Sequence, residues 1–166
     1  MAKITFHGGS IKTNGKLPKI GSKAKKFKLI KGDLSIAKLK DYKGTRLVLN
    51  IFPSVDTGTC AKSIIEFNKK AASLENTKVL CISRDLPFAQ SRFCGAEGIE
   101  NVETLSDFSK GKLGKKYGLI IKSGPLKNLF SRAIIVLNEN HEIIYTEHVQ
   151  EVADEPDYKN ALAVLA

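Results

Sequence analysis

Hydrophobic positions in the centre of the chain form two short continuous runs with a helically spaced segment between them. The first run is Leu47–Phe52, which ends at Pro53, and the second is Lys78–Ser83. Continuous apolar runs of this length are typical of strands buried on both faces. Residues 60–73 place apolar side chains at positions 64, 65, 67 and 71, and this spacing predicts a helix. The pattern therefore predicts a strand, a helix and a second strand.

The N-terminal part of the chain shows weaker patterns. Residues 3–15 predict a β-hairpin, with Thr13-Asn14-Gly15 as the turn signal. Residues 16–32 are rich in Lys and Gly, which predicts a surface loop that runs into a short strand at Phe27–Ile30. Ser35–Tyr42 is expected as a short turn or helix.

The rest of the chain continues the alternation of helices and strands. The predicted elements are a short helix at Pro87–Phe93 ended by Gly95, a weaker strand at Val102–Leu105, a helix at Lys110–Tyr117, strands at Arg132–Leu137 and Ile143–His148, and an amphipathic helix at 156–166. This order predicts an α/β fold with a mixed central sheet flanked by helices. No repeat or linker divides the chain, so we expect a single domain over 1–166.

Composition agrees with a folded, water-soluble protein. Apolar residues make up 42% of the chain and charged residues 27%. The first residues contain no apolar run suited to a signal peptide, and no stretch approaches the ~20 apolar residues that span a membrane. We therefore expect a cytoplasmic protein with no membrane partner.

The net charge of +10 is unevenly distributed. Residues 1–32 hold nine lysines and no acid, and seven acids lie between Glu139 and Asp157. A basic surface can recruit nucleic acid, an anionic membrane or an acidic protein, or it can be a solvated face that keeps the protein soluble. We favour the solvated face and expect no nucleic-acid partner, because no arginine-rich run with interleaved aromatic residues is present.

The chain contains three cysteines, Cys60, Cys81 and Cys94. An odd number without an export signal argues against a structural disulfide framework. Cys81 lies inside an apolar strand and is expected to be a buried, inert side chain. Cys60 falls in the first turn of the predicted helix, where unpaired N–H groups and the helix dipole favour a thiolate. From position alone, Cys60 is either a reactive thiol or a buried inert one.

The segment from Asn50 to Cys60 resolves this choice through a resemblance. Its Pro53-x-x-x-Thr57-x-x-Cys60 motif resembles the peroxiredoxin signature, and the wider segment is similar to the bacterial thiol peroxidases, which are atypical two-cysteine peroxiredoxins. The segments 85–98, 131–133 and 155–158 share this similarity, which covers nearly the whole chain. The resemblance implies a thioredoxin-like fold and a peroxidase that reduces hydroperoxides through a thiol.

The resemblance also implies a role for each site residue. Cys60 would be the peroxidatic thiolate, Thr57 would hydrogen-bond the peroxide, and Pro53 would shield the thiolate from water. Arg132 would supply a cation. Cys94 would be the resolving cysteine, forming an intramolecular disulfide with the sulfenic acid of Cys60 after local unwinding.

Further implications concern cofactors and partners. The resemblance implies alkyl or lipid hydroperoxides as substrates besides hydrogen peroxide, thioredoxin as reductant, a homodimer, and no cofactor. The three histidines, His7, His141 and His148, lack metal-ligand spacing, so no metal is expected. The chain has no Trp, which excludes a glutathione-peroxidase type of site.

Two other classes of function remain as alternatives. A thioredoxin-like disulfide reductase also places a cysteine at a helix start after a strand, although the Cys-x-x-Cys motif is absent. A basic nucleic-acid-binding module is the third class, and its binding would weaken steeply with salt.

Overall fold

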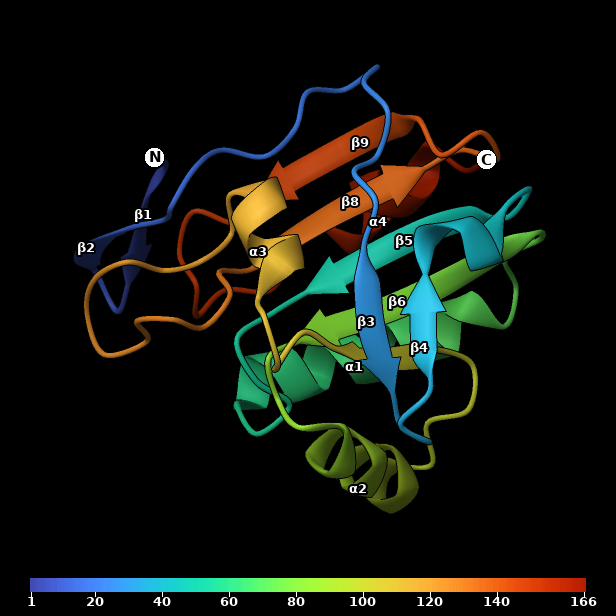
Figure 1. Ribbon diagram of the computed structural model, residues 1–166, viewed down its shortest axis with the longest axis horizontal. Helices are drawn as coiled ribbons and strands as arrows, with labels where there is room; N and C mark the ends of the chain where they lie inside the picture. The colour runs from blue at the N-terminus through green and yellow to red at the C-terminus, as the bar shows by residue number, and fades with distance from the viewer.

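A seven-stranded mixed sheet organises the chain in the computed structural model, which describes residues 1–166 (Figure 1). The strand order is β4-β3-β7-β6-β5-β8-β9. The strands are β3 (Lys28–Lys31), β4 (Ile36–Lys38), β5 (Arg46–Ile51), β6 (Thr77–Ser83), β7 (Glu103–Ser106), β8 (Ala133–Leu137) and β9 (Ile143–His148). The central strands β5, β6 and β7 run parallel, and the other pairs are antiparallel.

Two hydrophobic cores lie on opposite faces of this sheet. Alternate residues of a strand point to opposite faces, so Leu47 and Leu49 of β5 enter one core while Val48 enters the other. The helices α1 (Gly58–Ala71), α2 (Pro87–Glu97) and α4 (Tyr158–Ala163) contribute to the core that holds Cys60. The short helices η1 (Leu39–Tyr42) and α3 (Lys112–Tyr117) cover the other core, and α3 lies in front of the sheet in Figure 1.

The predicted N-terminal hairpin is present, but its turn lies elsewhere. Strands β1 (Lys3–Phe6) and β2 (Gly9–Lys12) are joined at His7 and Gly8, whose φ angles are 49° and 80°. Two successive positive φ angles match the twist of a two-residue hairpin turn. The predicted turn residue Asn14 instead anchors the hairpin, because its side-chain oxygen accepts a hydrogen bond of 2.8 Å from the Ile120 amide.

Several predicted boundaries also need correction. Ser35–Tyr42 forms the short strand β4 followed by η1, because residues 36–38 pair with β3. Helix α2 continues through Gly95 to Glu97 and ends at Gly98, whose φ of 64° is the left-handed conformation that closes helices. The last helix is shorter than predicted at both ends: Asp157 caps its start by accepting from the Asn160 amide at 2.9 Å, and Val164 is its C-cap.

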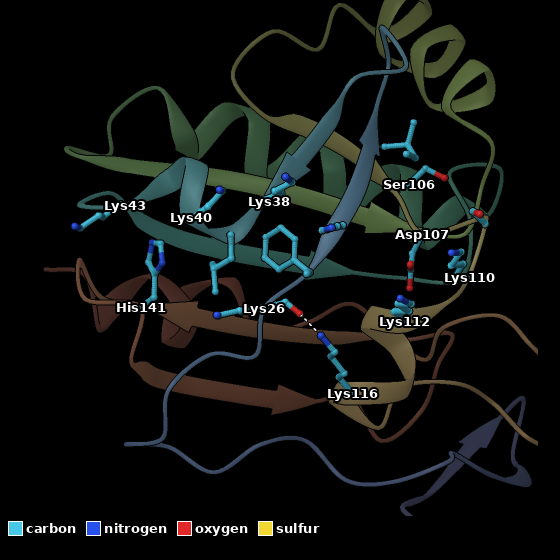
Figure 2. A pocket seen from close by; sticks show the side chains of 15 residues that line it. Lys26, Lys38, Lys40, Lys43, Ser106, Asp107, Lys110, Lys112, Lys116 and His141 are labelled. Carbon is cyan, nitrogen blue, oxygen red and sulfur yellow. Dashed lines mark hydrogen bonds between the residues drawn. The ribbon is translucent and has the colours of Figure 1, made fainter.

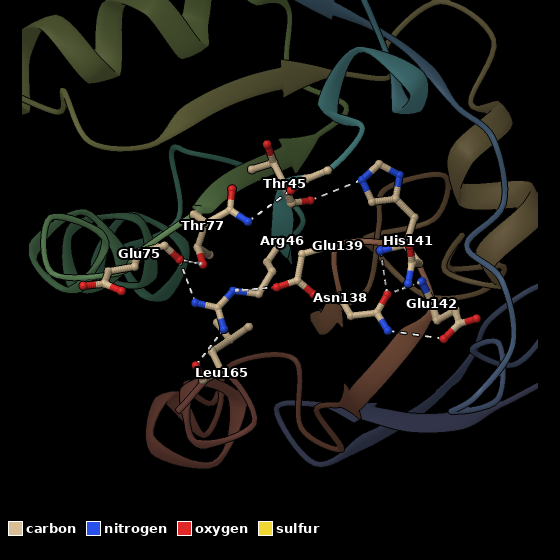
Figure 3. A network of polar contacts seen from close by, with 12 residues as sticks. Thr45, Arg46, Glu75, Thr77, Asn138, Glu139, His141, Glu142 and Leu165 are labelled. Atoms are coloured by element: carbon tan, nitrogen blue, oxygen red, sulfur yellow. Dashed lines mark hydrogen bonds and ion pairs between the residues drawn. The ribbon is translucent and has the colours of Figure 1, made fainter.

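Arg46 connects three segments that lie far apart in the sequence (Figure 3). Its guanidinium donates to the Leu165 carbonyl at 2.7 Å and to the Glu75 carbonyl at 2.6 Å. The Glu139 carboxylate lies 3.9 Å from Arg46 Nε. These contacts fix the end of the chain against the start of β5 and the loop before β6.

None of the helices is both long and apolar enough to cross a membrane.

Candidate active site

Cys60 lies in the first turn of α1, directly beyond the loop that follows β5. Thr57 is the N-cap of this helix, and its side-chain oxygen accepts a hydrogen bond of 3.3 Å from the Cys60 amide. The Thr57 hydroxyl hydrogen is not used by this cap and can still donate to a ligand. The geometry therefore allows one hydroxyl both to cap the helix and to donate to a peroxide. Cys60 itself is completely buried.

Arg132 brings a positive charge directly to this sulfur. Its Nη2 atom lies 3.3 Å from Cys60 Sγ, and its Nε donates to the Val152 carbonyl at 3.0 Å. The side chain is only 1% exposed, and its Nη1 atom has no hydrogen-bond partner. A buried guanidinium is costly unless polar or negative groups face it, and Cys60 Sγ is the group that Nη2 faces. The unpartnered Nη1 leaves one donor for a further ligand.

One segment near the end of the chain holds these elements together. Besides accepting from Arg132 at Val152, it accepts a 2.9 Å hydrogen bond from Thr59 of α1 at the Ala153 carbonyl. The Glu151 carboxylate accepts from the amide of Ala153 and from the hairpin turn. The Ala153 amide first, and then the turn, lower the pKa of Glu151 to about 2. Residues 151–153 therefore set the position of Arg132, the helix start and the hairpin together.

A cavity of about 280 Å³ is lined by residues that contact or neighbour Cys60, although Cys60 itself does not line it. Pro53, Thr57 and Arg132 line it, so the structure brings these three predicted residues to one place. The lining also includes the apolar residues Phe6 and Leu126. The N-terminal hairpin thus contributes to the site, which sequence reasoning missed because no local signal links residue 6 to residue 60.

Cys94 lies on a separate element, α2, and is half-buried. Its Sγ is 4.0 Å from the Thr104 hydroxyl, and burial raises the pKa of its thiol. Cys60, Cys81 and Cys94 all carry free thiols in this structure. Cys81 is fully buried in β6, and burial raises its pKa to about 12, as expected for an inert thiol.

Asp85 is a second residue that sequence reasoning did not single out. It follows β6, and its carboxylate accepts from Ser54 Oγ at 2.7 Å and from the Val55 amide at 2.9 Å. An exposed ion pair of 2.8 Å between Arg92 of α2 and Asp56 lies alongside. The loop before Cys60 is therefore tied to the segment that carries Cys94. Because β5 and β6 are parallel, polar residues after their ends meet at one edge, and this rule could have identified Asp85.

Comparison with known proteins identifies the family of this chain. Residues 19–162 match the Redoxin family. A thiol peroxidase of Corynebacterium glutamicum is 52% identical over 165 residues, which cover 99% of each chain. This chain belongs to the thiol peroxidase family. The family carries out thiol-dependent reduction of peroxides, and the chain is an enzyme of the peroxiredoxin type.

Solved structures of related proteins agree with the fold. A peroxiredoxin-like protein from Aquifex aeolicus superposes with a TM-score of 0.92 at 31% identity, covering 99% of this chain and 96% of its own. Thiol peroxidase from Chromobacterium violaceum gives a TM-score of 0.89 at 22% identity, with 98% and 94% coverage. The thioredoxin-like architecture predicted from the sequence is confirmed.

Proposed function

We propose that Cys60 is the peroxidatic thiolate of this peroxidase. The observation that carries the proposal is the buried Arg132 guanidinium, with Nη2 at 3.3 Å from Cys60 Sγ and Nη1 unpartnered. The sulfur attacks one peroxide oxygen, a sulfur–oxygen bond forms, and the oxygen–oxygen bond breaks. The departing oxygen leaves with both electrons and takes up a proton to become water or an alcohol. Cys60 is left as a sulfenic acid.

The neighbouring donors stabilise the charge that moves during this step. Negative charge leaves the sulfur and builds on the departing oxygen, so fixed donors along the peroxide lower the barrier. Thr57 and Arg132 both line the cavity, and the Thr57 hydroxyl hydrogen and Arg132 Nη1 have no acceptor within the protein. Pro53 lines the same cavity and offers no N–H of its own, which suits a role in keeping water from the thiolate.

Cys94 is proposed as the resolving cysteine. Its sulfur attacks the Cys60 sulfenic acid, a disulfide forms, and water leaves. Each sulfur starts in its own helix, so bonding requires part of α1 or α2 to unwind. The Asp56–Arg92 ion pair must separate if α2 moves away from the loop. Closing a loop of this length constrains the unfolded chain by about 4 kcal/mol, while strain in the folded chain keeps the bond reducible.

The cavity supports an organic hydroperoxide as substrate in addition to hydrogen peroxide. Phe6, Leu126 and Val152 give it an apolar side that suits an alkyl or lipid chain. Thioredoxin is the proposed reductant, and a cytoplasmic homodimer is the proposed state, both from the family. A disulfide reductase is not favoured, because such an enzyme presents its thiol to another protein, whereas Cys60 is completely buried.

The test is peroxide consumption with a thioredoxin system. We expect Cys60→Ser to abolish turnover and the matched control Cys81→Ser to leave it nearly unchanged, since Cys81 is enclosed in the core. Persistent turnover by Cys60→Ser would refute the assignment. A parallel assay with a small dithiol in place of thioredoxin tests the choice of reductant separately from the peroxidase reaction. Turnover with the dithiol but not with thioredoxin would overturn only the thioredoxin proposal.

A further inference from the structure

Lysines from distant parts of the chain converge on a cleft on the other face of the sheet. The cleft has a volume of about 800 Å³, and Figure 2 shows the side chains that line it. Lys26 and Lys28 come from the chain before and at the start of β3. Lys38, Lys40 and Lys43 come from β4 and the 3-10 helix that follows. These five positive charges form one side of the cleft.

The other side is formed by α3 and the loop before it. Lys110, Lys112 and Lys116 line the cleft there, which brings the number of lysines to eight. None of the eight is within ion-pair distance of a carboxylate. The cleft contains one acid, Asp107, which is 5% exposed and accepts from the Leu113 amide at 3.0 Å. The cleft lysines are mostly exposed, so they are still a solvated face, but they gather around one concavity without a paired carboxylate.

This arrangement has an energetic consequence. Like charges held around one cavity repel each other, and the repulsion lowers stability until an anion enters. Lysine is a compact point charge that suits phosphate groups. Several lysines around one volume suit an anion that carries several charges in a short length. The cleft lies on the core that contains Phe27 and Leu39, whereas Cys60 belongs to the core across the sheet, so this is a second site.

We propose that this lysine cleft binds a compact oligophosphate, either free or as the phosphate chain of a nucleotide. Its volume lies within the roughly 300–1,000 Å³ of small-molecule sites. An extended nucleic acid fits less well, because the lining contains no Arg and no Trp or Tyr. Its Phe27 ring is only 4% exposed, and its other ring, the imidazole of His141, is held by the Tyr42 carbonyl at 3.0 Å. Ile30 and Leu39 form an apolar floor beside the charges.

Titration calorimetry with inorganic tripolyphosphate tests the proposal. The variant Lys40→Gln/Lys110→Gln/Lys112→Gln removes three cleft charges whose ammonium groups make no hydrogen bond or ion pair within the protein. The control Lys12→Gln/Lys127→Gln/Lys159→Gln removes the same charge from exposed positions outside the cleft. We expect the cleft variant to weaken binding at least about 10-fold and the control less than about 2-fold. Peroxidase turnover of both variants should equal that of the wild type, which shows that they fold.

Salt and ligand series complete the test. Wild-type affinity should fall at least about 5-fold between about 0.05 M and about 0.3 M salt, as expected for charge-driven binding. ATP binding as tightly as tripolyphosphate identifies the phosphate chain as the recognised group, and tighter ATP binding adds a contact of the base with the apolar floor. The proposal is overturned if wild type shows no binding at low salt, or if both variants weaken equally. Tighter binding of a single-stranded oligonucleotide than of tripolyphosphate would also overturn it.

Discussion

Replacing Arg132 with Met removes the cation beside the proposed nucleophile while keeping a long apolar stem. In the native chain Arg132 Nη2 lies 3.3 Å from Cys60 Sγ, and neither side chain is open to solvent. The substitution also leaves the Val152 carbonyl without the 3.0 Å hydrogen bond from Nε. The variant therefore tests electrostatics and also disturbs a structural contact, so the controls must separate the two.

The expected size of the effect follows from the distance. Two unit charges 3.3 Å apart attract by about 5 kcal/mol at an effective dielectric constant of about 20. Part of this attraction offsets the cost of burying both charges, and net values for charged hydrogen bonds are about 1.5–3 kcal/mol. We take the net value, since water can enter the space that Met leaves. Each 1.36 kcal/mol changes a rate tenfold, so peroxide should attack about 10- to 150-fold more slowly.

Stopped-flow oxidation of the reduced enzyme by excess peroxide measures this step without the reductant. Alkylation of Cys60 by iodoacetamide provides a second rate that needs the thiolate but no donors to a peroxide. Equal losses in both rates mean that Arg132 acts only on the sulfur, and a larger loss with peroxide means that Nη1 also binds the substrate. Arg132→Lys, which keeps the charge, should react at an intermediate rate. A folded Arg132→Met that reacts within about threefold of wild type would refute the assignment.

Three further variants test other parts of the site. Thr57→Val should lower the free energy of unfolding by about 1 kcal/mol through loss of the cap, and it should slow peroxide attack at least about 10-fold. Thr57→Ser should restore both quantities, which denaturant unfolding and stopped-flow kinetics measure. An unchanged attack rate in Thr57→Val would remove Thr57 from the mechanism. Cys94→Ser should complete one turnover and then accumulate sulfinic acid at Cys60. Mass mapping of the wild type after one equivalent of peroxide should show a Cys60–Cys94 disulfide within one chain. A dominant disulfide between chains, or one to Cys81, would contradict this prediction. Cys81 keeps its proton in the folded chain up to about pH 12 but releases it near pH 9.0 in the unfolded chain. Its contribution to the free energy of unfolding is therefore fully present below pH 9.0 and is lost as the pH rises toward 12. Between about pH 8 and about pH 10 wild type should therefore lose about 1 kcal/mol more unfolding free energy than Cys81→Ala, and parallel pH curves would contradict this.

The sequence was most informative where one local pattern decides the structure. The apolar run of β5 and the cysteine after its loop predicted both the central strand and the position of Cys60 in the first turn of α1. Residues 35–42 were misjudged because β4 exists only through pairing with β3, which no local pattern records. The contribution of Phe6 to the cavity was missed for the same reason.

Motif similarity and geometry supplied different parts of the site. The resemblance led to Arg132, which position alone would have left as one more basic residue near the start of a strand. The geometry added the carboxylate of Asp85, which accepts from the loop before Cys60. It also changed the meaning of the lysines. Their number was visible in the sequence, but their convergence on one cleft depends on how β4, η1 and α3 pack.

The contacts of Cys60 reach very different distances along the chain, and this affects when the thiol becomes reactive. Its cap is Thr57, three residues away, whereas Arg132 follows 72 residues later and is itself held by Val152, another 20 residues on. A ribosome that releases the chain from its N-terminus completes β5 and α1 long before the guanidinium emerges. During synthesis Cys60 therefore lacks the guanidinium that faces its sulfur in the folded chain. On the proposal that Cys60 attacks peroxide, full reactivity then requires residues 132–152 to have packed against the start of α1.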